Sequence, residues 1–223
     1  MIHPKNYIIS LLLLTSSLIV KGQSDDRFNV NHGVVVQKID SSLKSKIQTL
    51  QFGSSIGVIF PAEYSSSILS SRYDSNFVQT FTPDSNLIRM VEGEIVRQYC
   101  HAEKQWQDEK WEEDKNYYSR IWEHKELKKA KKRYHYWLNY IDTACPRWQY
   151  DLRYIDKQFM GYITKAGEKI IYVQLCDFRE DPYKLKNVFK ESWIQGWHGW
   201  FYTHCRFRYF NINKNTSTIN GDG

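Results

Sequence analysis

The sequence lacks an apolar run long enough for a typical transmembrane helix. Its longest run, Ile8 to Val20, is shorter than the roughly 17–25 residues that a helix needs to cross a bilayer. Lys5 precedes the run and Lys21-Gly22-Gln23 follows it, a pattern typical of a secretory signal peptide. We therefore predict a signal peptide over residues 1–23 and a mature protein that is secreted or periplasmic. Lys21 stands where a small residue usually precedes the cut, so an uncleaved membrane anchor is the alternative.

A strong charge of either sign is also absent. The formal net charge of +6 includes Lys5 and Lys21, so the chain that remains after the signal carries +4. Binding by phosphate neutralisation needs a concentrated basic face, so no nucleic-acid partner is expected. Mean hydropathy is only −0.62, although the chain contains 8 Trp and 16 Tyr. Large rings are therefore expected to supply much of the buried area.

Cysteines are few, and none forms a CxxC pair. All four, Cys100, Cys145, Cys176 and Cys205, follow the predicted signal. An even count in an oxidising compartment predicts two disulfides, for which three connectivities exist. Cys176 ends one predicted strand and Cys205 lies in the next, so we predict Cys176–Cys205 and, by default, Cys100–Cys145. Reduced cysteines are the alternative.

No catalytic motif of the sequence has the spacing and the flanking secondary structure that its chemistry requires. Gly53-Ser54-Ser55-Ile56-Gly57 matches G-x-S-x-G, but a nucleophile elbow needs a strand before the serine and a helix after it. Here a helical pattern precedes and a strand pattern follows, so Ser55 is interpreted as a turn serine. The histidines show no metalloprotease spacing, so neither a metal nor a cofactor is predicted. The five considered are His101, His124, His135, His198 and His204.

The order of apolar patterns predicts an α+β fold, with helices first and an antiparallel sheet last. An N-terminal extension, residues 24–81, has one strand-like piece, Val34-Val35-Val36. It then has a short helix from Ser41 to Phe52 and a strand from Ile56 to Phe60. The serine-rich stretch from Ser65 to Ser75 is predicted to be a loop. The main domain is predicted over residues 82–223.

Two long amphipathic helices are predicted at the start of the main domain. Thr82-Pro83-Asp84 has the capping hydroxyl, proline and acid typical of a helix start. Apolar residues at steps of three and four then predict one buried stripe, and a second stripe ends near Cys145-Pro146. The first stripe is Ile88, Val91, Ile95, Tyr99, Ala102 and Trp106, and the second is Leu127, Ala130, Tyr134, Trp137 and Ile141.

The apolar period then changes to two. Gln158 to Thr164 and Lys169 to Asp177 alternate around a short glycine-containing turn, which predicts a hairpin. Trp200 to Ile212 predicts a third strand and Ser217 to Ile219 a fourth. The expected architecture is a four-stranded antiparallel meander under long helices, similar in outline to the cystatin-like fold, although that outline implies no inhibitor function.

Short motifs in this C-terminal part resemble small exported proteins of unassigned function from Bacteroidetes-type bacteria. The motifs are Phe81-Thr82-Pro83-Asp84, Gln158-Phe159-Met160-Gly161-Tyr162-Ile163 and Gly167-Glu168-Lys169-Ile170-Ile171-Tyr172-Val173. In such proteins a hairpin of this kind precedes a glycine-rich strand, and the chain ends near Asn-Gly. The resemblance covers residues 82–223, except for the charged insertion at 106–132, and it implies no known activity.

The densest basic segment, Glu126 to Arg133, has Leu127 and Ala130 within the apolar stripe. Its lysines are therefore interpreted as the solvated face of a helix, partly neutralised by Asp108-Glu109 and Glu112-Glu113-Asp114 upstream. Binding of this segment to an anionic surface or polymer is the alternative.

The Trp-rich segment from Trp193 to Trp200 is the predicted binding patch. Because Gly196 and Gly199 bracket Trp197 and His198, we hypothesise that these two residues lie at an exposed apex, in a form that suits a hot spot. Trp193 and Trp200 are expected to pack on a sheet face made by Ile171, Val173 and Leu175. Rings that all fold into the core are the alternative.

These observations favour a non-catalytic binding or cell-envelope module with no assigned cofactor. Its partner would be an unknown protein or an envelope polymer, with membrane contact only if the signal is uncleaved. The alternative function is an envelope hydrolase that uses His198 with a nearby acid, Asp177 or Glu180.

Overall fold

A computed structural model describes residues 28–31, 34–72, 77–177, 193–194, 196–199 and 205–219. The predicted signal peptide lies outside these residues. Among the helices of the described part, none is both long enough and apolar enough to cross a membrane.

The centre of the fold is a seven-stranded mixed sheet with helices, which confirms the α+β class. Its strand order is β10-β9-β7-β6-β4-β3, and β5 pairs with β6. Strands β6, β7, β9 and β10 of this sheet form an antiparallel run, but β4 pairs with β6 in parallel. The strands are β3 (Gln48–Phe52), β4 (Ser55–Ile59), β5 (Phe77–Phe81), β6 (Asp156–Thr164), β7 (Lys169–Cys176), β9 (Cys205–Asn211) and β10 (Thr216–Thr218).

The sheet is therefore larger than the predicted four-stranded, cystatin-like meander, and it is not purely antiparallel. Residues 48–81 were assigned to an extension, yet they contribute β3, β4 and β5 to the same sheet as residues 82–223. The physical reason is burial: Val58 and Ile59 on β4 are fully buried in the cores on the two faces of the sheet. A separate N-terminal piece could not cover these side chains by itself.

The hairpin of β6 and β7 forms as predicted. Gly167 in its turn has a φ of +81°, a conformation that glycine adopts without a steric penalty. The Gly167 N–H donates to Thr164 O at 2.9 Å, and the Thr164 N–H donates to Glu168 O at 2.9 Å. These bonds set the register that brings Ile171 and Val173 to one face and Tyr172 to the other.

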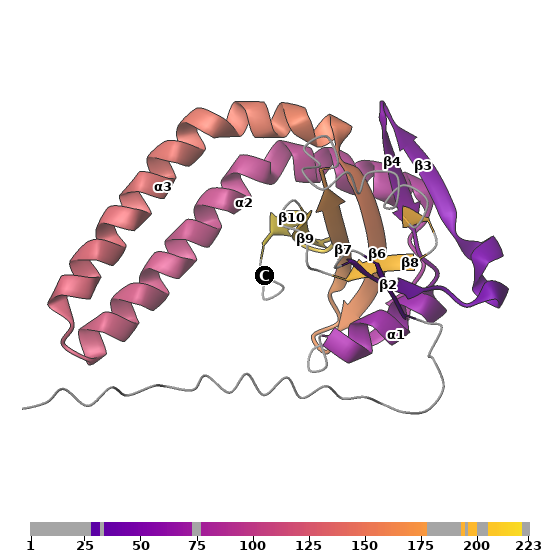
Figure 1. Cartoon of the computed structure of the whole chain (residues 1–223), viewed down its shortest axis with the longest axis horizontal. Coiled ribbons are helices and arrows are strands. Elements are labelled where there is room, and N and C mark those ends of the chain that lie inside the picture. The colour runs from indigo at the N-terminus through magenta and orange to yellow at the C-terminus, as the bar shows by residue number, and fades with distance from the viewer. Residues whose placement is uncertain are drawn as a thin grey trace, which may run out of the picture.

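Two long helices form an antiparallel hairpin over one face of the sheet. They are α2 (Ser85–Arg120) and α3 (His124–Asp151), and Figure 1 shows that both extend together beyond the strands. Asp84 caps α2 by accepting from the backbone N–H groups of Asn86 and Leu87, whereas the Thr82 hydroxyl accepts from Ala62 N–H. The predicted stripe of α2 is buried from Ile88 to Ala102.

Helix α3 does not end at Pro146, as was predicted, but continues to Asp151. The proline removes one backbone donor, and the turn that follows it is held from outside the helix. Gln149 Nε2 donates to Val96 O of α2 at 3.0 Å, and Leu152, immediately after the helix, is buried in the core beneath α2. Tertiary contacts thus outweigh the local penalty of the proline.

The opposite face of the sheet is covered by α1 (Ala62–Arg72) and by a second sheet with the order β1-β2-β8 (Figure 1). Its strands are β1 (Phe28–Asn31), β2 (Val34–Lys38) and β8 (Gly196–Gly199). Of the predicted helix from Ser41 to Phe52, only a 3-10 helix from Ser41 to Lys46 forms, and β3 follows it.

The predicted loop from Ser65 to Ser75 is wrong, because most of it lies in α1. Tyr64, Ser65, Ile68 and Leu69 are buried at helical spacing and pack on the sheet. The Ser65 hydroxyl donates to Pro61 O at 3.0 Å. Serine hydroxyls that bond to the preceding turn of a helix do not need a loop, so serine content was misleading here.

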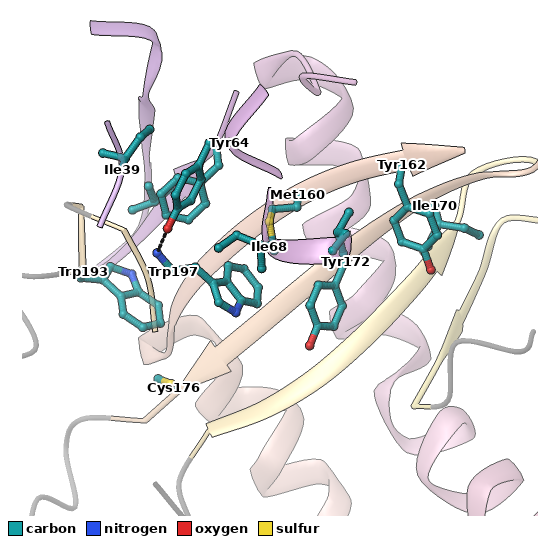
Figure 2. Packing of buried hydrophobic residues seen from close by; sticks show 13 residues of the cluster. Ile39, Tyr64, Ile68, Met160, Tyr162, Ile170, Tyr172, Cys176, Trp193 and Trp197 are labelled. Atoms are coloured by element: carbon teal, nitrogen blue, oxygen red, sulfur yellow. Dashed lines mark hydrogen bonds between the residues drawn. The ribbon is translucent and has the colours of Figure 1, made fainter. Parts of the chain in front are cut away.

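Trp197 is not at an exposed apex, so this prediction is wrong. Residues Gly196–Gly199 are extended and pair with β2, and the Trp197 side chain is 1% exposed. Its ring lies 5.1 Å from that of Tyr172 and 6.2 Å from that of Phe60, and its backbone N–H donates to Tyr64 Oη at 2.6 Å (Figure 2). Burial of a large ring is more favourable than its display, because apolar area leaves water.

Trp193 is buried, as expected, but on the other face of the sheet. It belongs to the cluster of Met160, Tyr172 and Trp197, whereas the expected partners Ile171, Val173 and Leu175 face α2. Trp200 lies outside the described residues.

One of the two predicted disulfides is confirmed and the other stays a prediction. Cys100 and Cys145 form a disulfide that joins α2 to α3, with Cα atoms 5.7 Å apart. Cys176 is also disulfide-bonded, and its Cα partner in the register of β7 and β9 is Cys205. The Cys205 side chain lies outside the described residues, so the Cys176–Cys205 bond stays a prediction that the register supports.

Candidate functional site

A cavity of about 680 Å³ lies between the helical hairpin and strand β9; we call it the hairpin cavity. It is lined by α2, α3 and β9, with Ile219 after β10 at its border. In Figure 1 the two helices pass over β9 and β10. Its aromatic lining from the two helices is Trp106, Trp111, Tyr134, Trp137, Tyr140 and Trp148. Phe207 and Tyr209 of β9 also border it, but their rings stack on Tyr172 on the other face of the sheet.

One wall of the cavity is the inner face of α2. Glu103, Gln107, Lys110 and Asp114 recur at steps of three and four, so they lie along one side of the helix. Nearer the sheet this same side carries the buried stripe that ends at Ala102. The wall is therefore the continuation of the core-facing stripe, where polar and aromatic side chains replace aliphatic ones.

The opposite wall is α3, which several contacts hold against α2. The disulfide Cys100–Cys145 joins the helices near the sheet. Farther out, Tyr134 Oη donates to Asp108 Oδ1 at 2.7 Å, and its ring stacks on Trp111 with centroids 5.5 Å apart. These contacts keep the two walls at a set distance.

Strand β9 forms the floor and places two arginines under the helices. Arg206 and Arg208 alternate with aromatic residues, so both point to the face that α2 covers. The Arg208 side chain is 2% exposed, forms a short ion pair with Glu103, and lies 4.5 Å from the centroid of the Tyr99 ring. Its Nε has no hydrogen-bond partner among the described residues.

Arg206 is the more accessible of the two, with a side chain that is 50% exposed. Its Nη1 donates to Tyr99 Oη at 2.6 Å, and its guanidinium carbon lies 5.5 Å from the centroid of the Trp148 ring. Burial raises the pKa of Tyr99, which keeps this hydroxyl neutral. Arg206 is therefore held by two neutral contacts, and Glu103 Oε1 lies 3.6 Å from its Nη1.

The lining offers groups that suit binding. Aromatic walls offer apolar and stacking surface, and the arginines and Lys110 offer positive charge. Among its lining residues there is no serine, cysteine or histidine that could act as a nucleophile or its base. No group of three or more metal-ligating side chains occurs in the part of the chain that the structure describes.

The residues predicted as functional are not brought together here. Trp197 is buried in the core, and the His198 side chain and Glu180 lie outside the described residues. Asp177 is half-buried at the end of β7. Ser55, interpreted as a turn serine, is the buried first residue of β4, directly after the turn at residues 53–54, and its hydroxyl donates to Phe52 O at 3.0 Å.

Other surface expectations are confirmed. His101, His124 and His135 are exposed. The lysines of the basic segment Glu126 to Arg133 are exposed around buried Ala130, and Arg133 Nη2 pairs with Asp114 Oδ2 at 2.7 Å. The segment is thus the solvated face of a helix with an acidic counterpart on α2.

The hairpin cavity was not among the predicted sites, although the sequence contains two signals for it. Both helices carry aromatic residues that meet when α3 folds back on α2: Trp106 and Trp111 on α2, and Tyr134 and Trp137 on α3. Arginines at alternate positions of an aromatic strand, as in β9, also indicate charge beneath a helical layer.

Comparison of the chain with protein-family models, with curated proteins and with solved structures found no match.

Proposed function

We propose that this chain is an exported, non-catalytic binding protein whose ligand occupies the hairpin cavity. The observation that carries the proposal is a concave space of about 680 Å³ between β9 and two disulfide-linked helices that line it with aromatic rings. Volumes of roughly 300–1,000 Å³ with apolar walls and a few polar groups are typical of small-molecule sites.

Rigidity of the walls supports a binding role. The disulfide, the Trp111–Tyr134 stack and the bond from Tyr134 to Asp108 are already formed in the free chain. A preformed site loses little conformational freedom when the ligand enters, so more of the contact energy appears as affinity.

Export is the second element of the proposal. It rests on the apolar run at residues 8–20, and the disulfide Cys100–Cys145 is compatible with an oxidising compartment. The resemblance to exported proteins of Bacteroidetes-type bacteria points the same way. N-terminal sequencing of the protein from its native host tests export: a start at or near Ser24 supports it, and an intact Met1 contradicts signal cleavage.

Binding is tested with a neutral fluorescent probe, N-phenyl-1-naphthylamine, whose emission rises in apolar surroundings. We expect saturable binding of one probe per chain and a clear loss of affinity in Trp137→Ala, because Trp137 lines the cavity. Trp122→Ala is the matched control, since this Trp is 80% exposed at the tip of the hairpin and outside the cavity lining. Equal binding by the two variants would contradict the proposed site.

A further inference from the structure

The charges that line the hairpin cavity are unequal in number. The cations are Lys110, Arg133, Arg206 and Arg208, and the carboxylates are Glu103 and Asp114. We infer that the ligand carries a small oxyanion group, such as a carboxylate, sulfonate or phosphate, next to a flat apolar ring. This inference rests on the proposed function and adds the chemical class of the ligand.

Three of the four cations lie in ion pairs with these two carboxylates, and Arg206 and Arg208 share Glu103. Arg133 Nη2 lies 2.7 Å from Asp114 Oδ2, and Arg208 forms the short ion pair with Glu103. Lys110 has no ion pair in the described part of the chain. The cavity therefore keeps a positive excess, which a ligand anion would balance.

Arg206 is the cation best placed to receive that anion. Its closest carboxylate oxygen, Glu103 Oε1, is 3.6 Å from Nη1, beyond hydrogen-bond distance, and it is already engaged by Arg208. Within the described residues Arg206 donates one hydrogen bond, from Nη1 to Tyr99 Oη. Nε and Nη2 make none within the described residues, and together they present the fork that binds an oxyanion through two bonds.

The surroundings of Arg206 hold this fork in place. Tyr99 holds Nη1 from one side and the Trp148 ring lies beneath the guanidinium. A side chain that is already positioned loses less rotamer freedom on binding than a free surface arginine does. Arg206 therefore has the features of a built anion site and not those of an isolated surface charge.

The ring of the ligand is indicated by the neighbours of Arg206. The Tyr140 and Trp148 rings meet edge to face, with centroids 5.5 Å apart, and Tyr140 is 41% exposed. A flat group attached to the anion would cover this exposed ring surface while the anion reaches Arg206. A purely apolar ligand would leave the arginine fork unused, and a cationic ligand would be repelled by it.

A pair of probes with the same rings separates charge from shape. They are 8-anilinonaphthalene-1-sulfonate, which is anionic, and N-phenyl-1-naphthylamine, which is neutral. We expect the sulfonate to bind more tightly and its affinity to fall as salt rises, because salt screens the ion pair. Arg206→Gln should weaken the sulfonate by about tenfold or more, as expected for the loss of a charge-assisted hydrogen bond. It should leave the neutral probe within about twofold, since only the ring contacts remain for it.

Three further variants keep the test decisive. Lys110→Gln removes the exposed cation that has no ion pair among the described residues, so it tests charge even if Arg206→Gln unfolds. Arg206→Lys keeps the charge but loses the fork, and an affinity between those of wild type and Arg206→Gln is expected. Lys132→Gln, on the exposed face of α3 outside the cavity lining, should change neither probe.

The outcomes distinguish this inference from the proposed function. If Trp137→Ala weakens both probes but neither Arg206→Gln nor Lys110→Gln affects the sulfonate selectively, the cavity binds ligands without an anion preference and the inference is overturned. If neither probe binds, or Trp137→Ala changes neither, the proposed function itself fails.

Discussion

Trp197→Ala should lower the free energy of unfolding strongly, because the Trp197 ring fills the core between β8 and the main sheet. The side chain is 1% exposed and lies between Tyr172 and Phe60. Truncation of a buried tryptophan costs about 3–5 kcal/mol, from lost burial and from the cavity that remains. For a chain of this size about 1 kcal/mol shifts Tm by about 2–4 °C, so a fall of about 6–20 °C is expected.

Urea unfolding followed by far-UV circular dichroism measures this loss. Trp122→Ala is the matched control, because that side chain is 80% exposed and its truncation should change the free energy of unfolding by less than about 0.5 kcal/mol. Tyr64→Phe should lie between them, at about 1–3 kcal/mol, since it leaves the buried Trp197 N–H without its acceptor. If Trp197→Ala is tolerated as well as Trp122→Ala, the described packing of β8 is refuted.

Three other predictions follow from the same structure. Replacing Cys100 and Cys145 by serine removes a 45-residue cross-link and should lower the free energy of unfolding by about 4 kcal/mol, measured in urea; an unchanged midpoint would contradict the disulfide. Burial lowers the pKa of Lys157 in the folded chain below the 10.5 of the unfolded chain. Between these two pKa values the unfolded chain binds more protons, so the free energy of unfolding should rise with pH across that window. Lys157→Met should abolish this rise, and a pH profile of stability that is the same in the variant would contradict the lowered pKa of Lys157. Glu103→Gln leaves Arg208 buried without a carboxylate and should lower the free energy of unfolding by about 3–5 kcal/mol. The double variant Glu103→Leu, Arg208→Met should recover most of this stability, because neither charge is then buried. An equal loss of stability in the single and the double variant would contradict the importance of this ion pair.

Elements with a strong local signal were predictable from the sequence. The regular apolar steps from Ile88 to Ala102 predicted α2 correctly, although the helix is capped by Asp84 and not, as was expected, by Thr82. The hairpin of β6 and β7 was equally clear, since Gly167 provides the turn and the strands alternate on both sides.

Elements that depend on tertiary contacts were not predictable. Helix α1 is rich in serine. The hydroxyls of Ser65 and Ser67 donate to carbonyl groups of the preceding turn, while Ile68 packs on the sheet. Helix α3 passes through Pro146 because Gln149 and the disulfide fasten it to α2. In both places local propensity favours another structure and packing overrides it.

The predicted binding patch failed for a similar reason. Glycines at 196 and 199 suit a turn, but they also suit a strand that passes close to other chain segments, and pairing of β8 with β2 selects the strand. The hairpin cavity was missed because its residues come from three separate elements. Only the antiparallel return of α3 brings Tyr134 to Trp111, and the sequence does not show how far the two helices overlap.

The most direct test of the cavity as a ligand site is the two-dimensional NMR spectrum of the tryptophan indole N–H groups during titration with N-phenyl-1-naphthylamine. The tryptophans of the chain serve as local reporters, because Trp106, Trp111, Trp137 and Trp148 line the cavity and Trp122 and Trp197 do not. Saturable shifts in the signals of the four lining tryptophans, with those of Trp122 and Trp197 unchanged, are expected. Shifts confined to Trp122 or Trp197, or no saturable shift in any of the four, would contradict the account.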